Sequence, residues 1–342
     1  KDMNVELCQD SGPWDAYVEA NPRATNYHRW RWKQLIESTY GHRTFYLAAR
    51  EDGKIRGVLP LVGIKSWLWG RFLVSMPFFS YGGILADTPE AHEQLLNKAE
   101  SLAGDWGAKH IELRQAEALN GSWQSSTAKV SMSVPLPETS EKLFGSLASR
   151  LRNKIRSAQK QGLRAQWGKE ELVKDFYKVF SCNMRNLGTP VYPRAWFENF
   201  LRVARDTSHI LLVWDGEEPV AGTFITTYRD QVELPWIAST PAARGKYSTV
   251  FLYWTALEWA AQNSFRRVDL GRCTPGSGTH RFKTQWLCEE VPLPWSYWLK
   301  EGGTLPQLRP DNPRLRLAVE AWKRLPLSVA NLLGPRIVRA IP

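Results

Sequence analysis

Two segments of the chain have the same form: Phe45-Tyr-Leu-Ala-Ala-Arg-Glu-Asp-Gly-Lys-Ile-Arg-Gly-Val-Leu59 and Ile210-Leu-Leu-Val-Trp-Asp-Gly-Glu-Glu-Pro-Val-Ala-Gly-Thr-Phe224. In each, an apolar run ends at an Asp-Gly pair, and a second apolar run begins near a further glycine. An Asp-Gly pair between two apolar runs is typical of a β-hairpin turn. We therefore expect one hairpin in each half of the chain, although two hairpins can also be alike by chance.

The elements expected around each hairpin repeat in one order: hairpin, third strand, helix, further strand. In the first half these are strands 45–50, 57–64 and 72–77, helix 89–102 and strand 111–114; in the second they are strands 210–214, 220–227 and 231–239, helix 249–263 and strand 267–270. Helices are also expected over residues 27–39, 140–161, 170–186 and 195–204. This order predicts an α/β (α+β) protein with two tandem domains of mixed sheet, followed by an amphipathic tail.

The predicted boundaries are 1–135 for the N-terminal domain, 136–300 for the C-terminal domain and 301–342 for the tail. The tail is basic and amphipathic, so it suits either an anionic membrane surface or packing against the body of the protein. No run of about 18 apolar residues is long enough to span a bilayer.

The net charge of +11 favours a polyanionic ligand, such as a nucleotide cofactor, a nucleic acid or an acidic lipid surface. The four cysteines form no C-x-x-C pair and have no histidine at metal spacing. We expect neither a metal site nor a disulfide framework, and a reducing cytoplasm fits this pattern best.

Positive charge is densest in Arg150-Leu-Arg-Asn-Lys-Ile-Arg-Ser-Ala-Gln-Lys-Gln-Gly-Leu163. Arg152, Arg156 and Lys160 recur at a spacing of four residues, so they share one face of the expected helix. No Asp or Glu lies between Lys142 and Lys169 to offset them. This helix either binds a phosphate or carboxylate or carries a solvated basic face.

Three motifs occur together with this pattern: Arg150-x-Arg152-x-x-Ile155-x-x-Ala158-x-Lys160-x-Gly162-Leu163, Gly188-Thr-Pro190, and Asp269-x-Gly-Arg272 followed by Gly278-x-x-x-Phe282-Lys283-x-x-Trp286. The hairpins resemble the GNAT acyltransferase fold. The motifs, over residues 21–299, resemble the Fem-type (FemAB-like) family of tandem GNAT proteins, which includes the aminoacyl-tRNA-dependent transferases of peptidoglycan cross-bridges. Leu59-Pro-Leu, Ser75-Met-Pro-Phe and Tyr81-Gly-Gly are similar to the FemAB-like branch associated with exosortase and PEP-CTERM exopolysaccharide loci.

The resemblance implies which residues are catalytic. Lys283 matches a lysine at the active site of the bridge enzymes, with a surface lysine as the alternative. Arg272 ends the strand that carries Asp269, its possible structural partner, and Glu233 is the best-placed carboxylate for a general base. The residues expected to bind substrate are Arg152, Arg156, Lys160, Tyr192, Phe282 and Trp286. In GNAT enzymes the loop before the helix binds coenzyme A pyrophosphate, which implies cofactor contacts from Arg244, Gly245 and Lys246.

These features predict an N-acyltransferase or aminoacyltransferase that acts on an amine in exopolysaccharide or cell-envelope assembly. The expected co-substrate is an acyl-CoA, an acyl carrier or an aminoacyl-tRNA, with no tightly bound cofactor and no metal. The expected acceptor is a sugar- or lipid-linked amine, and the expected location is the cytoplasm or the inner face of the membrane. One alternative is a non-catalytic GNAT-like module that binds a polyanionic or lipid-linked glycan. A nucleic-acid-binding role is less well supported, since no such motif is present and DNA is not an expected partner.

Overall fold

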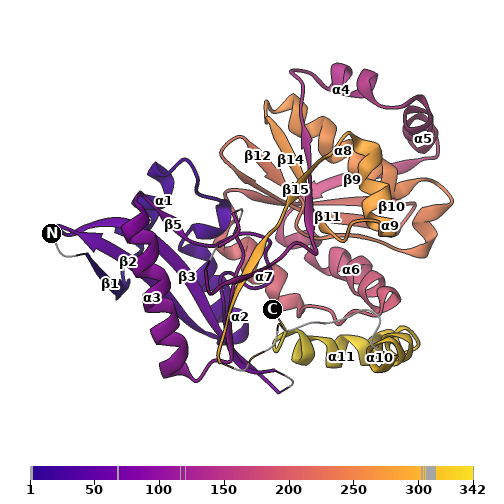
Figure 1. The fold of residues 1–342 in the computed structure, drawn as a ribbon. Coiled ribbons are helices and arrows are strands. Elements are labelled where there is room, and N and C mark those ends of the chain that lie inside the picture. The colour runs from indigo at the N-terminus through magenta and orange to yellow at the C-terminus, as the bar shows by residue number, and fades with distance from the viewer. Residues whose placement is uncertain are drawn as a thin grey trace. The chain divides into compact units, whose positions relative to one another are not determined.

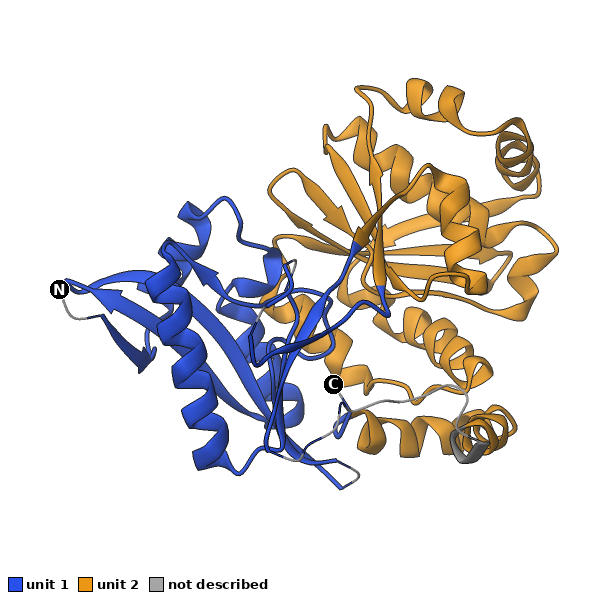
Figure 2. Ribbon diagram, viewed as in Figure 1, with its two compact units in different colours: residues 1–129, 292–307, 339–342 blue, residues 130–291, 308–338 orange. Residues whose placement is uncertain are grey.

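The computed structural model of the protein describes residues 3–67, 69–115, 117–119, 121–301, 303, 305 and 313–341. The chain divides into two compact units, which Figure 2 shows in different colours. Unit 1 comprises Lys1–Lys129, Pro292–Gln307 and Arg339–Pro342, and unit 2 comprises Val130–Val291 and Leu308–Val338. Each unit contains one mixed β-sheet and its own helices (Figure 1). Among the described residues, no helix has both the length and the apolar composition that crossing a membrane requires.

The sheet of unit 1 has the strand order β1-β2-β3-β4-β6-β16-β7, and β5 pairs with β3. Its strands are β1 Asn4–Leu7, β2 Arg43–Glu51, β3 Lys54–Ser66, β4 Gly70–Val74, β5 Leu85–Ala86, β6 His110–Leu113, β7 Gln124–Ser126 and β16 Trp295–Leu299. β2 and β3 form the first predicted hairpin, and Asp52 and Gly53 at its turn both have positive φ (50° and 75°). β4 and β6 run parallel to each other, which makes the sheet mixed.

The helices of unit 1 cover both faces of its sheet. They are α1 Ser11–Ala20, the 3₁₀ turn η1 Asn26–His28, α2 Arg31–Tyr40 and α3 Pro89–Trp106. Thr88 caps the start of α3, since its side chain accepts a hydrogen bond from the Ala91 N–H, and the helix buries an apolar stripe against the sheet. On the other face, Trp14 of α1 packs against Tyr46 of β2.

The sheet of unit 2 has the order β15-β8-β14-β12-β11-β10-β9, and β13 pairs with β11. Its strands are β8 Val130–Pro135, β9 Leu163–Gly168, β10 Ser208–Asp215, β11 Glu218–Tyr228, β12 Gln231–Glu233, β13 Ile237–Ser239, β14 Arg267–Cys273 and β15 Glu289–Pro292. β10 and β11 form the second predicted hairpin, with Gly216 in the left-handed region at its turn. β12 and β14 run parallel, as β4 and β6 do in unit 1.

The helices of unit 2 form two layers. They are α4 Ser140–Ser146, α5 Ser149–Gln159, η2 Glu170–Leu172, α6 Val173–Leu187, α7 Arg194–Val203, η3 Pro241–Arg244, α8 Ser248–Gln262, α9 Gly278–Lys283, η4 Thr284–Trp286, α10 Pro313–Lys323 and α11 Leu327–Val338. α8, with α4 and α5 against it, contributes to the main apolar core of the unit. α6 and α7 contact the sheet through an aromatic cluster that includes Phe176, Phe197 and Phe224.

Each sheet contains a strand that lies outside the sequence range of its other strands. β8 follows β7 in the sequence but pairs with β14 of unit 2. β16 follows β15 but pairs with β6 and β7 of unit 1. The compact units therefore differ from the expected ranges 1–135, 136–300 and 301–342, because strand pairing and not sequence position decides where β8 and β16 belong.

The single helix predicted over residues 140–161 is wrong, because the structure has two helices there. Leu147 and Ala148, which separate α4 from α5, have extended backbone (ψ 148° and 142°). A glycine inside a helix costs about 1 kcal/mol relative to alanine, so Gly145 already weakens a continuous helix. Leu147 and Leu151 are nevertheless buried in the core with α8, as the apolar pattern predicts.

The predicted tail contains α10 and α11, and both helices contact α6. Gly188, at the left-handed C-cap of α6, lies so close to α10 that an added Cβ would stand 2.4 Å from Cγ1 of Val319. Gly334 of α11 has a similarly close neighbour in Val191. The described helices of the tail therefore pack on unit 2, while Leu317 and Leu332 remain exposed (71% and 62%). Residues 306–312 of the tail lie outside the described residues.

Candidate active site

Two neighbouring strands of unit 2 separate part-way along their length. β12 pairs with β14 only from Gln231 to Glu233, and a last hydrogen bond joins the Leu234 N–H to the Asp269 carbonyl at 2.9 Å. Beyond this point β13 stays with β11, and β14 continues beside β8. The continuous strand predicted over residues 231–239 is therefore wrong. Among the described strands, no ladder joins β13 to β14.

The amine of Lys283 lies where these strands separate. Its Nζ donates hydrogen bonds to the carbonyl oxygens of Gly271 (2.9 Å) and Arg272 (3.3 Å) on β14. The residue is only 4% exposed, which excludes the alternative of a surface lysine. Burial lowers the pKa of Lys283 below its ordinary value of 10.5, and the neighbouring Cys273 and Asp269 oppose this shift. An ammonium has three N–H groups, so these two bonds leave one for a further acceptor.

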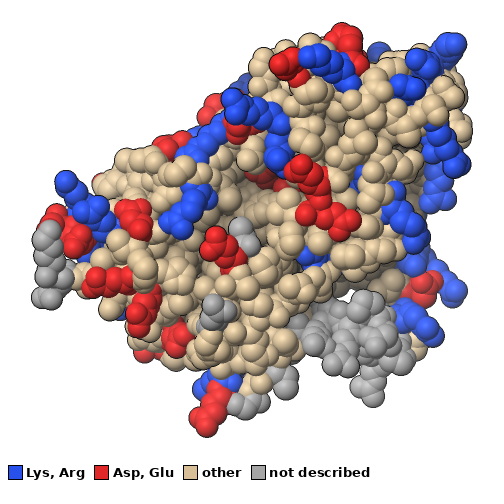
Figure 3. Space-filling view, turned by 45° about the horizontal axis from the view of Figure 1, so that its top comes forward, with Lys and Arg blue, Asp and Glu red and all other residues tan. Residues whose placement is uncertain are grey.

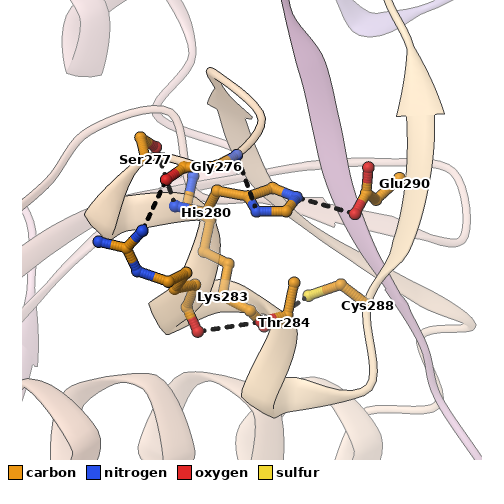
Figure 4. A network of polar contacts seen from close by, with 8 residues as sticks. Gly276, Ser277, His280, Lys283, Thr284, Cys288 and Glu290 are labelled. Atoms are coloured by element: carbon orange, nitrogen blue, oxygen red, sulfur yellow. Dashed lines mark hydrogen bonds and ion pairs between the residues drawn. The ribbon is translucent and has the colours of Figure 1, made fainter.

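A network of polar contacts fixes α9, the helix that ends with Lys283 (Figure 4). The Oγ of Ser277 accepts a hydrogen bond from the His280 N–H (3.1 Å) and caps the helix. The Nε2 of His280 lies 2.8 Å from a carboxylate oxygen of Glu290, which ties α9 to β15. The thiol of Cys288 donates a hydrogen bond to the Lys283 carbonyl (3.1 Å). The backbone that carries the amine is therefore held at both ends.

Phe282 and Trp286, which were expected to bind substrate, pack against Tyr253 of α8. The ring centroids lie 5.0 Å and 5.6 Å from that of Tyr253. Trp286 is completely buried in the core, so its ring cannot contact a substrate that enters from solvent. The expected substrate contact is corrected for Trp286, whose ring stacks on Tyr253 in the core, whereas Phe282 is only partly buried.

Two carboxylates lie side by side at the last paired residues of β12 and β14. Glu233 and Asp269 are register partners in a parallel pair, so their side chains project from the same face of the sheet, and both are at least nine-tenths buried. One carboxylate oxygen of Asp269 accepts hydrogen bonds from the Ser131 hydroxyl and the Gly271 N–H, each at 2.7 Å. Asp269 thus holds the backbone of β14 at Gly271. Glu233 is the last residue of β12, at the point where β13 and β14 separate.

Arg272 lies opposite Ser131 of β8, just after a shift in the register of β14. Gly271, which has φ +81°, permits this shift, since few other residues adopt that conformation. The three residues expected to be catalytic are Lys283, Arg272 and Glu233. The structure therefore brings them to the region where β12 ends and β14 continues without it.

The loop between β13 and α8 contains the three residues expected to bind a cofactor. Arg244 and Gly245 are exposed, whereas the Nζ of Lys246 forms an ion pair with Asp215 at 2.7 Å. The Oγ of Ser248, in the first turn of α8, is buried and has no hydrogen-bond partner among the described residues. The N-terminus of a helix carries unpaired N–H groups and partial positive charge, so this position suits a phosphate.

Residues 145–284 match the model of the acetyltransferase (GNAT) domain. Among solved structures, the crystal structure of FemX has a TM-score of 0.67 and 14% identity, covering 88% of this chain and 98% of FemX. L-PGS from Bacillus licheniformis gives 0.57 and 12%, covering 92% and 98%. A tandem GNAT protein from the clavulanic acid biosynthesis pathway gives 0.57 and 11%, covering 89% and 99%. No curated protein matches the sequence.

The chain has a Fem-like tandem GNAT fold. This confirms the expected architecture of two GNAT-like domains with mixed sheets. The matched GNAT range runs from the end of α4 to Thr284, so it contains α5, the loop before α8, the separation of β13 from β14 and Lys283.

The basic helix of the GNAT range is α5, and it packs against α8. Figure 3 shows basic side chains gathered at the upper right, over the region where Figure 1 labels α5. The three predicted cations differ in their surroundings. Arg152 donates a hydrogen bond to the Gly145 carbonyl (2.9 Å), Arg156 lies over the ring of Phe144 (5.2 Å), and Lys160 is the exposed C-cap. Arg152 therefore also joins α5 to α4, and Arg156 and Lys160 are the more accessible charges.

Tyr192 lies in the aromatic cluster of α6 and α7 and not beside Lys283. Its ring stacks on Trp196 (5.7 Å) and meets Trp236 edge-on (6.1 Å). Trp236 belongs to the interruption between β12 and β13. Tyr192 thus contacts Trp236, which lies where β12 and β13 are interrupted, and does not itself lie at the site. A substitution of Tyr192 would therefore affect the site only through Trp236.

In unit 1, the position that corresponds to the separation of β13 from β14 is occupied by an ion pair between two side chains of the unit. The Ser75 N–H bonds to the Glu112 carbonyl at 2.9 Å, as Leu234 does to Asp269. The carboxylate of Glu112, however, pairs with Arg114 at 2.7 Å, and both side chains are buried. Arg114 also donates to the Phe79 carbonyl (2.7 Å) and lies over the Trp295 ring (4.3 Å). Among the described residues, therefore, unit 2 alone combines the separation with a lysine amine.

The sequence did not indicate two polar residues of this site. Ser131 lies on β8, for which no strand was predicted, and nothing in its neighbourhood signals a contact with a residue 138 positions away. Ser248 follows the Arg244–Tyr247 segment directly, so its place at a helix start was a usable signal.

Proposed function

We propose that unit 2 transfers an acyl or aminoacyl group from a phosphate-bearing donor to an amine. The observation that carries this proposal is the buried amine of Lys283 at the separation of β13 from β14. An extended donor that contains amides suits the point where β13 and β14 separate, and the loop before α8 suits its phosphate. The similar folds of FemX and L-PGS support transfer as the type of reaction.

In the proposed reaction the amine nitrogen attacks the carbonyl carbon of the donor. The carbonyl oxygen then gains negative charge, which the remaining N–H of the Lys283 ammonium stabilises. Glu233 takes the proton that the amine loses. The tetrahedral intermediate collapses to an amide and expels the thiolate or alkoxide of the donor, which takes up the proton that Glu233 accepted, so that Glu233 returns to its carboxylate form.

We further propose that the acceptor is a sugar- or lipid-linked amine in exopolysaccharide or cell-envelope assembly, on the cytoplasmic side of the membrane. The basic surface of α5 supports an acceptor or donor that carries phosphate. The alternative is a GNAT-like module that binds a glycan without catalysis. A panel of acyl-CoAs, acyl carriers and aminoacyl-tRNAs, each tested for thermal stabilisation and for transfer to amino sugars, separates the two. Binding without transfer to any amine would favour the module.

Gly245→Val is expected to abolish stabilisation by the active donor and leave the melting temperature unchanged. Gly245 has φ −66°, and an added Cβ would meet nothing within 4 Å, so the fold accepts a side chain there. A valine would nevertheless obstruct a phosphate that approaches the loop backbone. Differential scanning fluorimetry with and without donor measures both effects. Gly104→Val, also with open space but on α3, is the matched control.

Arg156→Gln combined with Lys160→Gln is expected to weaken binding of the active donor about tenfold or more with little change in stability, since exposed cations contribute little to folding. Titration calorimetry at two salt concentrations measures the affinity. A variant with Lys174 and Lys178 changed to Gln removes the same charge from α6 and serves as the control. Equal donor affinities for the two variants would show that the cations of α5 form a solvated face and do not bind the donor.

A further inference from the structure

Five cations gather at one end of the sheet of unit 1. Arg43 begins β2, Lys65 lies directly opposite Arg71 at the end of the β3–β4 hairpin, and Lys109 precedes β6. Backbone hydrogen bonds join Lys109 to Arg71 (2.8 Å) and Lys300 to Lys109 (3.0 Å). The ends of these neighbouring strands therefore lie side by side, and together they form one edge of unit 1. All five residues are exposed.

Three of these cations surround the indole of Trp106, the last residue of α3. The charged groups of Arg43, Lys65 and Arg71 lie 5.5, 5.3 and 5.5 Å from the ring centroid. An aromatic ring holds a cation in place without neutralising it. Within the part of the chain that the structure describes, none of the five forms an ion pair with a carboxylate. The charge at this edge is therefore available to an external anion.

Trp67 stands at the tip of the same hairpin and is 75% exposed, the most exposed large apolar side chain of the described residues. The hairpin projects it beyond Lys65 and Arg71, with which it shares the β3–β4 connection. An indole on a projecting turn, with cations behind it, matches the residue preference of the interface between lipid headgroups and hydrocarbon.

We propose that this edge of unit 1, formed by Arg43, Lys65, Trp67, Arg71, Lys109 and Lys300, docks on an anionic lipid bilayer. Trp67 enters the headgroup region, and the five cations face the lipid phosphates. The arrangement suits a surface of many anions better than a single ligand, because the cations extend from Arg43 to Lys300, beyond the three that surround Trp106. The inference is independent of the transfer proposed for unit 2, since every residue belongs to unit 1.

The experiment is cosedimentation of the full chain with vesicles of phosphatidylcholine alone or mixed with phosphatidylglycerol. We expect binding only to the mixed vesicles and a loss on raising salt. Lys65→Gln, Lys109→Gln and Lys300→Gln together should lower partitioning about 100-fold, since each cation near an anionic surface contributes about fivefold. Trp67→Ser should lower it about tenfold, because a largely exposed indole loses its apolar contact.

The matched control changes Lys54, Lys98 and Lys174 to Gln, which removes the same charge from exposed positions elsewhere. It should leave partitioning unchanged to within about twofold. Melting temperatures show whether any variant is unfolded. Equal losses for the two triple variants would overturn the proposal in favour of net charge alone. Loss of binding on Leu332→Ser with Leu333→Ser, but not on Trp67→Ser, would transfer the contact to α11. Tighter binding of tRNA than of vesicles, lost in the same edge variants, would assign the surface to nucleic acid.

Discussion

Replacing Lys283 by methionine is expected to lower the rate of acyl transfer about 100-fold to 1,000-fold, the range found when one oxyanion donor is removed. Methionine keeps most of the buried apolar stem and removes the amine that bonds to the carbonyls of Gly271 and Arg272. The rate constant should fall much more than donor affinity, because the lost bond strengthens as charge develops. Single-turnover measurements with the donor found in the panel separate the two.

Lys178→Met is the control, since Lys178 is exposed and pairs only with Glu218 among its described contacts. An unchanged rate for Lys283→Met in a protein that melts normally would remove Lys283 from the mechanism.

The same variant also tests how the buried charge of Lys283 affects stability. Because the pKa of Lys283 is lowered on folding, the unfolded chain holds more protons between that lowered pKa and 10.5. The wild-type free energy of unfolding, relative to that of the variant, should therefore rise with pH toward 10.5.

Acid is expected to destabilise the protein by about 3 kcal/mol between pH 6.5 and pH 4 through His28 alone. His28 is buried, and burial lowers its pKa from 6.5 to about 4. Its Nδ1 accepts from the Thr25 N–H (3.0 Å), so Nε2 carries the proton that bonds to the Gly83 carbonyl (3.0 Å). Below pH 6.5 the unfolded chain gains a proton that the folded chain does not take up until about pH 4, so stability falls as the pH falls.

Urea unfolding from pH 7 to pH 4 measures this loss. His28→Gln keeps a donor and an acceptor and cannot titrate, so its curve should be flatter by the same amount. His42, whose pKa burial also lowers to about 4, provides a second variant with the same expected direction. Parallel curves for the wild type and His28→Gln would show that the loss arises elsewhere.

The local pattern of the sequence was sufficient to predict the two hairpins and, in each unit, the later helix and the strand that follows it, because turn chemistry and apolar periodicity act over a few residues. It was not sufficient for β8 and β16, whose pairing partners are distant in the sequence. The interruption at residues 234–236 was also missed, since an apolar run reads as one strand whether or not its neighbour diverges. Motif matching placed Lys283 correctly near Arg272, but it could not show that Trp286 is buried in the core or that Lys246 pairs with Asp215.

The position of β16 in the sheet of unit 1 has a consequence for how the protein is made. Its residues Trp295–Leu299 lie between β6 and β7, which are complete in the growing chain long before. During synthesis at roughly 5–20 residues per second, the Val130–Val291 part of unit 2 leaves the ribosome before this strand does. The N-terminal sheet therefore forms with the position between β6 and the edge strand β7 unfilled, and the backbone edge of β6 is exposed to chaperones or to neighbouring nascent chains until β16 arrives.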